Sequence, residues 1–259
     1  EDCTTIDEPG EYELENDITG GGTLGPDDDA CIDIEGVSGV TLDGNDYVLE
    51  GDGDGAGIRV SSGEVTIRTL TVRGFEDGFR TELGPRATIR SATIEQNSIG
   101  IDGDLSEISC TNSIIRDNDG AGISSFDGVG SIVRDCEIRG DGGTPAGDCC
   151  RGPVVIEDCT IVGNDGPINL IPVPGTRIER AETAKSGVSG ISTSYGDRGN
   201  TPDEPVRIVD SYIHHNDGPG INHRNGYFEV RSRTLSGNLD GYRSESALGG
   251  GSRTQVHQQ

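Results

Sequence analysis

The sequence predicts an all-β fold, a single-stranded right-handed parallel β-helix of about nine or ten coils with three strands in each coil. The first observation is a repeat of about 22 residues, a period that is typical of solenoids. The second is that each repeat holds three short alternating pieces and no stretch with helical periodicity. Each repeat starts at an apolar residue, and the eight starts are separated by 22, 21, 23, 23, 22, 30 and 22 residues: Ile67, Ile89, Cys110, Val133, Ile156, Ile178, Ile208 and Val230.

The three pieces of a repeat predict three strands that are joined by tight corners. Residues 65–67, 70–72 and 78–79 are alternating pieces separated by glycine and polar residues. Stacked repeats place equivalent strands above one another, which gives three parallel sheets. Five residues after each start lies an aliphatic column that we expect to form much of the core: Val72, Ile94, Ile115, Ile138, Ile161, Thr183, Ile213 and Leu235.

One polar column is also repeated, eight residues after the start. Asparagine tolerates tight turn conformations, and its amide can bond the local backbone and the equivalent amide one coil away. We therefore expect a structural ladder at one corner rather than a ligand site. Phe75, Asp141 and Ser186 replace asparagine in three coils. The ladder consists of Asn97, Asn118, Asn164, Asn216 and Asn238.

The repeat divides the chain into three parts. Residues 1–31 are expected to form an N-terminal cap segment, residues 32–243 the β-helix, and residues 244–259 a tail that is flexible or ordered by a partner. Two insertions, 140–153 and 192–205, interrupt the coils before the next start. Both should project from the same side of the rod, where solenoids often carry function. In the last coil, Arg233 breaks a column of small inward residues.

Charge and cysteine content favour a location outside the cell. The net charge is −26, and Lys185 is the single lysine among 20 basic residues, which resembles proteins of extreme halophiles. Such a charge argues against nonspecific binding of nucleic acid, and no apolar run is long enough for membrane insertion. Seven cysteines without a CxxC pair favour an oxidising compartment. A signal peptide is presumed to have been removed.

The cysteines differ in their expected roles. Cys3 and Cys31 flank the segment before the regular coils, so a disulfide between them would hold that segment in place. Cys136 and Cys159 share an inward column of adjacent coils, where buried thiols are expected. Cys149 and Cys150 are neighbours in the first insertion. The connectivity stays open at this point.

With the coils laid out, the chain resembles the right-handed parallel β-helix repeat proteins, a pectate-lyase-like and NosD-like superfamily. Residues 3–6, 9–10, 31–34 and 40–44 are similar to the start of secreted haloarchaeal members. The resemblance covers about residues 3–242 and is specific for fold, because this fold hosts many functions. Enzymes of the superfamily act on acidic polysaccharides, but the Asn-Thr-Asp, Gly-His-Gly and Asp-Pro-His-Glu motifs of such enzymes are missing here. We expect no catalytic residues.

Three groups of side chains are candidates for binding. Outward positions one and six residues after the start carry six arginines, which we expect on one face, where they could bind an anionic glycan or an acidic neighbouring subunit, or pair with adjacent acids. His214, His215 and His223 are expected to point in three directions, which disfavours a metal site. Asp52 and Asp54, and residues 27–29, could hold calcium but lack the EF-hand spacing. The arginines are Arg68, Arg73, Arg90, Arg116, Arg134 and Arg139.

These features predict a secreted or cell-surface β-helix of a halophile that is not catalytic. Its role would be structural or adhesive, with assembly into a filament or surface layer as one form, because an open end of a β-helix offers unpaired strand edges. Its partners would be copies of itself or an anionic glycan. Two alternatives remain open, a polysaccharide lyase or hydrolase acting on an acidic glycan, and an anionic-glycan-binding module. No cofactor is expected beyond the possible calcium.

Overall fold

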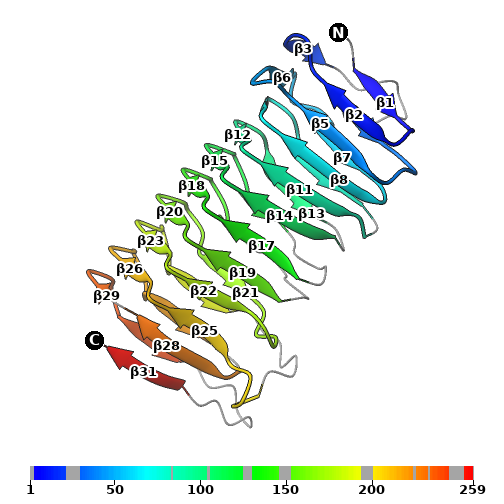
Figure 1. The fold of residues 1–259 in the computed structure, drawn as a ribbon. Coiled ribbons are helices and arrows are strands. Elements are labelled where there is room, and N and C mark those ends of the chain that lie inside the picture. The colour runs from blue at the N-terminus through cyan, green and yellow to red at the C-terminus, as the bar shows by residue number, and fades with distance from the viewer. Residues whose placement is uncertain are drawn as a thin grey trace.

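The computed structural model describes residues 3–21, 30–82, 84–103, 106–124, 130–145, 153–193, 201–223, 226–232, 234–244 and 254–258. Every regular element in these ranges is a β-strand, and the coils stack along one axis from the N-terminal to the C-terminal end (Figure 1). These ranges contain no helix that is long and apolar enough to cross a bilayer. The predicted all-β solenoid with parallel strands is confirmed.

The strands form three faces, which we call sheet 1, sheet 2 and sheet 3 in the order in which the regular repeat visits them. Sheet 1 contains 11 strands. They are β2 (Gly10–Glu13), β5 (Val40–Asp43), β8 (Glu64–Arg68), β11 (Arg86–Arg90), β14 (Glu107–Thr111), β17 (Ser131–Arg134), β19 (Val154–Glu157), β22 (Arg177–Glu179), β25 (Val206–Val209), β28 (Phe228–Ser232) and β31 (Thr254–Gln258).

Sheet 2 contains 10 strands, most of them three residues long. The short length follows from the tight corners that lie on both sides of each strand. The strands are β3 (Ile18–Gly21), β6 (Val48–Gly51), β9 (Thr71–Arg73), β12 (Thr93–Glu95), β15 (Ile114–Arg116), β18 (Glu137–Arg139), β20 (Thr160–Val162), β23 (Glu182–Ala184), β26 (Tyr212–His214) and β29 (Thr234–Ser236).

Sheet 3 is divided into a part of six strands and a part of four strands. The coil between the two parts passes through Pro145, whose carbonyl accepts the Ile123 amide but which has no N–H to donate to a ladder. The six strands are β1 (Thr4–Ile6), β4 (Ala30–Ile34), β7 (Ala56–Val60), β10 (Asp77–Thr81), β13 (Ile99–Gly103) and β16 (Ile123–Ser124). The four strands are β21 (Ile168–Leu170), β24 (Ile191–Thr193), β27 (Ile221–His223) and β30 (Tyr242–Ser244).

The regular repeat makes about eight turns, from β8 to β28, so the prediction of nine or ten coils slightly overcounts it. Equivalent residues stack in register, as where Ile89 pairs with Ile67 on one side and with Cys110 on the other. The starting column and the column five residues later are buried, with Ile67, Ile89 and Ile94 fully enclosed. Burial of these aliphatic columns, rather than a globular centre, supplies the hydrophobic stabilisation.

Left-handed backbone conformations close the corners on both sides of sheet 2. Two residues after each start, non-glycine residues from Thr69 to Asp210 have φ between 50° and 55°. Such a conformation costs about 1–2 kcal/mol per residue unless local bonds compensate it. At the next position, Ser113 and Ser211 each donate a hydroxyl proton to the carbonyl two residues earlier, at 2.9 Å.

Cysteines that lie three residues after the start make the same kind of hydrogen bond as the serines. Cys136 and Cys159 each donate to the carbonyl two residues earlier, at 3.2 Å. Both thiols are buried, and Cys136 Sγ lies 3.8 Å from the Sγ of Cys110. Hydrogen bonding within the thiol cluster and burial raise the pKa of Cys136 and of Cys159 well above the usual range. These thiols therefore stabilise the corner through hydrogen bonds and are not reactive nucleophiles.

The structure differs from the expected boundaries at both ends. Residues 3–21 are not a separate cap, because β1, β2 and β3 pair in parallel with β4, β5 and β6 and form a turn of the solenoid. A disulfide joins Cys3 to Cys31, with Cα atoms 4.5 Å apart. The segment after residue 243 adds β31, where Val256 pairs in register with Val230. Arg233 lies outside the described residues.

Candidate functional site

The six candidate arginines lie on two sheets rather than on one face. Arg68, Arg90 and Arg134 belong to sheet 1, and the other three belong to sheet 2. A left-handed corner between sheet 1 and sheet 2 lies between the positions one and six residues after the start. The chain therefore turns between the two sets of arginines, and a count along the sequence does not show this turn. The expectation of a single arginine face is therefore wrong in its geometry.

Five of the six arginines form ion pairs, four of them with an acid of a neighbouring coil. Because these acids occupy the guanidinium groups, the arginines hold adjacent coils together more than they offer charge to a ligand. Arg90 is exposed, and within the described ranges no acidic oxygen lies within 4.0 Å of it. The pairs are Arg68 with Asp43 (2.8 Å), Arg73 with Glu50 (2.9 Å), Arg116 with Glu95 (2.5 Å), Arg134 with Glu157 (2.7 Å) and Arg139 with Glu137 of its own strand (2.5 Å).

The asparagine column lies buried at the corner between sheet 2 and sheet 3. The Oδ1 atom of Asn118 accepts the backbone amide of Asn97 at 3.1 Å and the side-chain Nδ2 of Asn97 at 3.2 Å. Asn216 donates to Asn238 Oδ1 in the same way at 2.8 Å. Asn164 Oδ1 accepts the amide of residue 141 at 3.0 Å. All polar atoms of this column are directed into the fold, so it offers nothing to a ligand.

Asp141 interrupts the ladder with a buried carboxyl group. Its Oδ1 accepts the backbone amide and the Nδ2 of Asn118, at 3.0 and 2.9 Å. Its Oδ2 is buried and has no hydrogen-bond partner, whereas the Nδ2 of Asn164 in the equivalent place donates to the Ile138 carbonyl. Burial raises the pKa of Asp141 to about 6.

A second set of buried charges lies on the outward side of sheet 3. Arg59 donates from Nε and Nη2 to both oxygens of Asp33, at 3.0 and 2.6 Å, and only 3% of the Asp33 side chain is exposed. Arg80, which pairs in register with Arg59, donates to Asp77 Oδ2 at 2.6 Å. Burial raises the pKa of Asp77 to about 6. The bidentate pair of Asp33 and Arg59 joins β4 to β7, whereas Asp77 and Arg80 both belong to β10 and pair within that strand.

The histidines do not point in three separate directions. His214 and His215 meet, with their Nδ1 atoms 2.8 Å apart, while His223 is buried on β27 with its Nε2 3.1 Å from the Gly226 carbonyl oxygen. Burial lowers the pKa of His223. Within the described part of the chain no group of three or more His, Cys, Asp or Glu side chains is arranged to hold a metal. Asp27, Asp28, Asp29, Cys149 and Cys150 lie outside it.

A groove lies at the corner between sheet 3 and sheet 1, where the second insertion returns to the rod. Residues 201–204 form a tight turn in which the Glu204 amide donates to the Thr201 carbonyl at 3.1 Å. On one side of this turn is a cavity of about 290 Å³, and on the other side one of about 300 Å³. Asp203, Pro205 and Arg207 line both cavities, so the two form one groove astride the turn.

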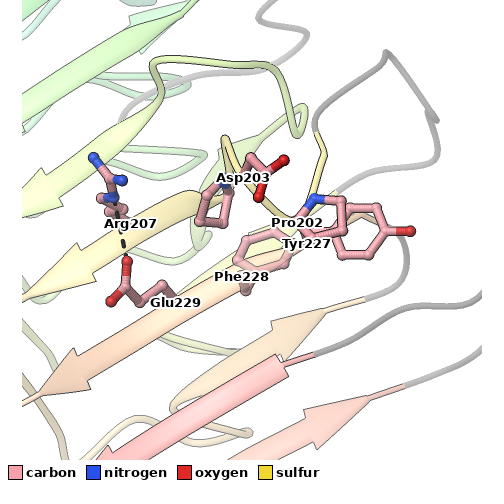
Figure 2. Close-up of a pocket in the computed structure, with 7 residues that line it drawn as sticks. Pro202, Asp203, Arg207, Tyr227, Phe228 and Glu229 are labelled. Atoms are coloured by element: carbon pink, nitrogen blue, oxygen red, sulfur yellow. Dashed lines mark hydrogen bonds and ion pairs between the residues drawn. The ribbon is translucent and has the colours of Figure 1, made fainter.

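The groove combines charged, hydroxyl and aromatic groups (Figure 2). Arg207 on β25 donates from Nε to Glu229 Oε2 on β28 at 3.2 Å, and Tyr227 and Pro202 lie at the other end of the cavity. Arg207 pairs in register with Arg177 of β22, so two guanidinium groups occupy adjacent coils. Such a set can hold a hydroxyl-rich or carboxylate-bearing ligand through directed hydrogen bonds and an aromatic contact.

Two polar atoms at the groove have no partner within the protein. Thr176 Oγ1 and Arg177 Nε are buried without a hydrogen bond, and only 2% of Thr176 is exposed. Arg177 Nε lies 3.6 Å from Glu179 Oε1, which is too long for a hydrogen bond. Buried polar groups are normally satisfied, so unpartnered ones that line a cavity favour a ligand there.

Sequence reasoning missed the groove residues although a signal was present. Arg177, Arg207 and Glu229 occupy the outward position one residue before the start, and the search for binding residues covered only the positions one and six residues after it. The same column is uncharged in the earlier coils, where it holds Thr66, Thr88, Ser109, Ile132 and Val155. The change from uncharged to charged residues, next to an insertion, could have identified the groove.

Comparison with known proteins places the chain among β-helices. Residues 15–150 and 106–254 match the family described as right handed beta helix region. The A-module of a mannuronan C-5 epimerase from Azotobacter vinelandii is 14% identical and superposes with a TM-score of 0.57, covering 99% of this chain and 91% of that module. The Dettilon tailspike protein is 13% identical with a TM-score of 0.52, covering 94% of this chain and 60% of the tailspike. No curated protein matches the sequence significantly.

Proposed function

Since the chain belongs to the right handed beta helix family, we propose that it is an extracellular, non-catalytic β-helix that binds an acidic polysaccharide in the groove at residues 201–207. The observation that carries this proposal is the in-register pair Arg177 and Arg207 beside the unpartnered Thr176 hydroxyl. Both arginines also face an acid, but at 3.6 Å (Arg177 to Glu179) and 3.2 Å (Arg207 to Glu229), which is longer than the 2.5–2.9 Å of the five ion pairs described above. Two guanidinium groups on adjacent coils can bind successive carboxylates of a polymer that runs along the rod.

The fold and the disulfide support the same proposal from independent directions. A structural neighbour of this chain is a mannuronan epimerase module, so a rod of this kind can present a long surface to a polysaccharide. The disulfide between Cys3 and Cys31 is the kind of bond that persists in oxidising compartments. A surface location in a salt-rich medium also suits a chain of net charge −26, because salt screens the repulsion between its acids.

Binding of defined oligosaccharides tests the proposal. We expect a polyuronate oligosaccharide to bind the chain, and Arg207→Glu to weaken its affinity by about tenfold or more, because the substitution reverses one charge in the groove. Arg86→Glu is the matched control, since Arg86 is also an exposed sheet 1 arginine that pairs with a glutamate of the next strand. Isothermal titration calorimetry measures the affinities of uronate and neutral oligomers of equal length for the parent chain and both variants. Equal loss in both variants, or equal binding of the neutral oligomer, would contradict it.

A glycan-processing enzyme is the second candidate, because Asp203, Glu229, Arg207 and Tyr227 line one cavity and provide acid, base and charge-stabilising groups. Incubation of the chain with polyuronates, followed by assays for reducing ends, unsaturated ends and C-5 configuration, tests this candidate. Product that forms with the parent chain and is lost in both Asp203→Asn and Glu229→Gln would establish the enzyme. Binding without product leaves the non-catalytic proposal in place.

Association of rods with one another is the other partner interaction expected from the sequence. Negative-stain electron microscopy at high salt, with and without the oligosaccharide, examines it in the same samples. Filaments or sheets would add a structural role to the binding role, and dispersed rods would restrict the function to binding.

A further inference from the structure

A pair of adjacent histidines stands on sheet 2, away from the groove. His214 ends β26, and His215 follows it at the corner, where both side chains reach solvent. Their Nδ1 atoms are 2.8 Å apart, their ring centroids are 5.0 Å apart, and the ring planes are nearly perpendicular at 89°. Neighbouring residues of a strand normally point to opposite faces, so this contact requires a special backbone.

The corner supplies that backbone. His215 has a φ of 54°, which turns its side chain back toward the strand that it follows. Its ring lies over Gly237 of the next coil, where a Cβ atom would come within 2.9 Å of His215 Cδ2. The absence of a side chain at position 237 therefore leaves room for the imidazole, and the ring is held with its Nδ1 toward His214.

Glu182 orients the first ring. It belongs to β23, where it pairs in register with Tyr212, and its Oε1 lies 3.1 Å from the Nε2 of His214. A carboxylate at this place favours the tautomer in which Nε2 carries the proton, so that Nδ1 keeps its lone pair. A carboxylate behind an imidazole is the arrangement that orients histidine ligands in metal sites.

We propose that His214 and His215 form an open site for a divalent metal ion with tetragonal preference, Cu²⁺ before Ni²⁺. Two nitrogens that are each about 2.0 Å from a metal and at right angles to each other are about 2.8 Å apart, whereas tetrahedral ligands are about 3.3 Å apart. The observed Nδ1 separation of 2.8 Å, which without metal is a hydrogen bond between the two rings, is the separation that the first geometry requires. The two imidazoles bind the ion, Glu182 positions His214, and water completes the coordination sphere.

This site needs only two protein ligands, so it is compatible with the finding that no cluster of three or more ligating side chains occurs in the described ranges. The net charge of −26 raises the local concentration of cations around the rod. Copper stands above nickel and zinc in affinity for nitrogen ligands, which sets the expected order of binding.

Titration of the full chain with CuCl₂ in excess Mg²⁺ tests the proposal, since Mg²⁺ occupies weak carboxylate sites. We expect one copper per chain, with an electron paramagnetic resonance spectrum of tetragonal Cu²⁺ that shows coupling to two imidazole nitrogens. His214→Ala and His215→Ala should each weaken binding by at least a hundredfold, and Glu182→Gln by about 10- to 100-fold. His257→Ala is the control and should bind copper like the parent chain.

His215 is exposed and His214 is partly buried at the surface, so these variants should keep the fold, which thermal melting without metal verifies. Copper binding that survives in His215→Ala, or that is lost in His257→Ala, would overturn the proposal. A zinc affinity above that of copper would overturn the tetragonal assignment. A Glu182→Gln variant that binds copper as the parent does would remove Glu182 from the site.

Discussion

The corners differ in how strictly their length is kept. Those on either side of sheet 2 contrast with the corner between sheet 3 and sheet 1. From β8 to β26, every link from sheet 1 to sheet 2 has two residues, whereas the links from sheet 3 to sheet 1 have between 3, after β7, and 12, after β24. Left-handed backbone conformations and buried hydrogen bonds fix the length of the link from sheet 1 to sheet 2. The link from sheet 3 to sheet 1 varies in length, and the groove lies there. We therefore propose that the polysaccharide binds at the corner of variable length, while the bonds that stabilise each coil lie at the corners of sheet 2.

The physical basis of the difference is where the polar groups find partners. At the corners of sheet 2, left-handed residues and the asparagine column direct their polar atoms into the fold. At the groove, the Thr176 hydroxyl and the Nε of Arg177 are buried without partners. Such groups cost stability unless a ligand satisfies them, and within the asparagine column Asp141 Oδ2 is a group of the same kind, which makes it the place where this corner can be improved.

Breaking the ladder should give the largest effect on stability. Asn118→Ala removes the acceptor of both Asn97 donors and the donor to Asp141, all of them buried. Each unsatisfied buried group costs about 1–3 kcal/mol, so we expect a loss of about 4 kcal/mol in the free energy of unfolding. Urea unfolding at constant high salt measures this loss.

Asn16→Ala is the control for that substitution. Asn16 is exposed and its amide bonds only the neighbouring carbonyl of Asp17, so the change should stay within about 0.5 kcal/mol. If the two variants unfolded at the same urea concentration, the ladder would not be the element that stabilises this corner.

The second prediction repairs the ladder where Asp141 interrupts it. The folded-state pKa of Asp141 is raised to about 6 from 3.8, because burial disfavours the charged form. Below pH 3.8 the carboxyl is protonated in both states and there is no penalty, while between about pH 4 and 6 the native state loses stability as the group ionises. Asp141→Asn should therefore stabilise the fold by about 2 kcal/mol at pH 8 and leave it unchanged near pH 3.5.

Thermal melting across pH 3.5 to 8 reads this difference, and Asp135→Asn controls for the loss of one negative charge. Asp135 is exposed in the neighbouring corner, so its variant measures the effect of removing one surface charge. Asp77, which burial also shifts to about 6, contributes to the parent chain with the same sign, and the difference between parent and Asp141→Asn removes that contribution. A gain that is equal at all pH values would show that folding does not shift the pKa of Asp141.

The fold could be predicted from sequence because each column repeats about eight times. The apolar starts and the asparagine column define three strands and one corner without any knowledge of long-range contacts. The ends were harder to predict, because β31 follows three glycines and 26 residues separate Val256 from its register partner Val230, a spacing that a period of 22 does not predict.

The groove and the histidine pair depend on information that the period does not contain. The outward column of Arg177, Arg207 and Glu229 is visible in sequence, but the place of the turn at 201–204 above it depends on how a 12-residue link returns to the rod. Likewise, strand alternation predicted that the side chains of His214 and His215 point in different directions. In the structure, the φ of 54° at His215 brings the two rings together. Left-handed corners turn side chains in ways that strand alternation does not predict.

The smallest expected effect concerns the outward arginines at the ends of the sheet 1 strands. Arg134 and Arg90 occupy the same outward column of sheet 1, but Arg134 pairs with Glu157 at 2.7 Å and Arg90 has no acidic neighbour within 4.0 Å among the residues described. Arg134→Ala should cost about 0.5–1 kcal/mol at low salt and less in 2 M NaCl, because exposed ion pairs are weak and screened. Arg90→Ala should leave the urea midpoint unchanged at both salt concentrations. An equal loss in the two variants would mean that the column stabilises the rod through its general positive charge, and the division between structural corners and a ligand-binding corner would then have to include the arginines on the binding side.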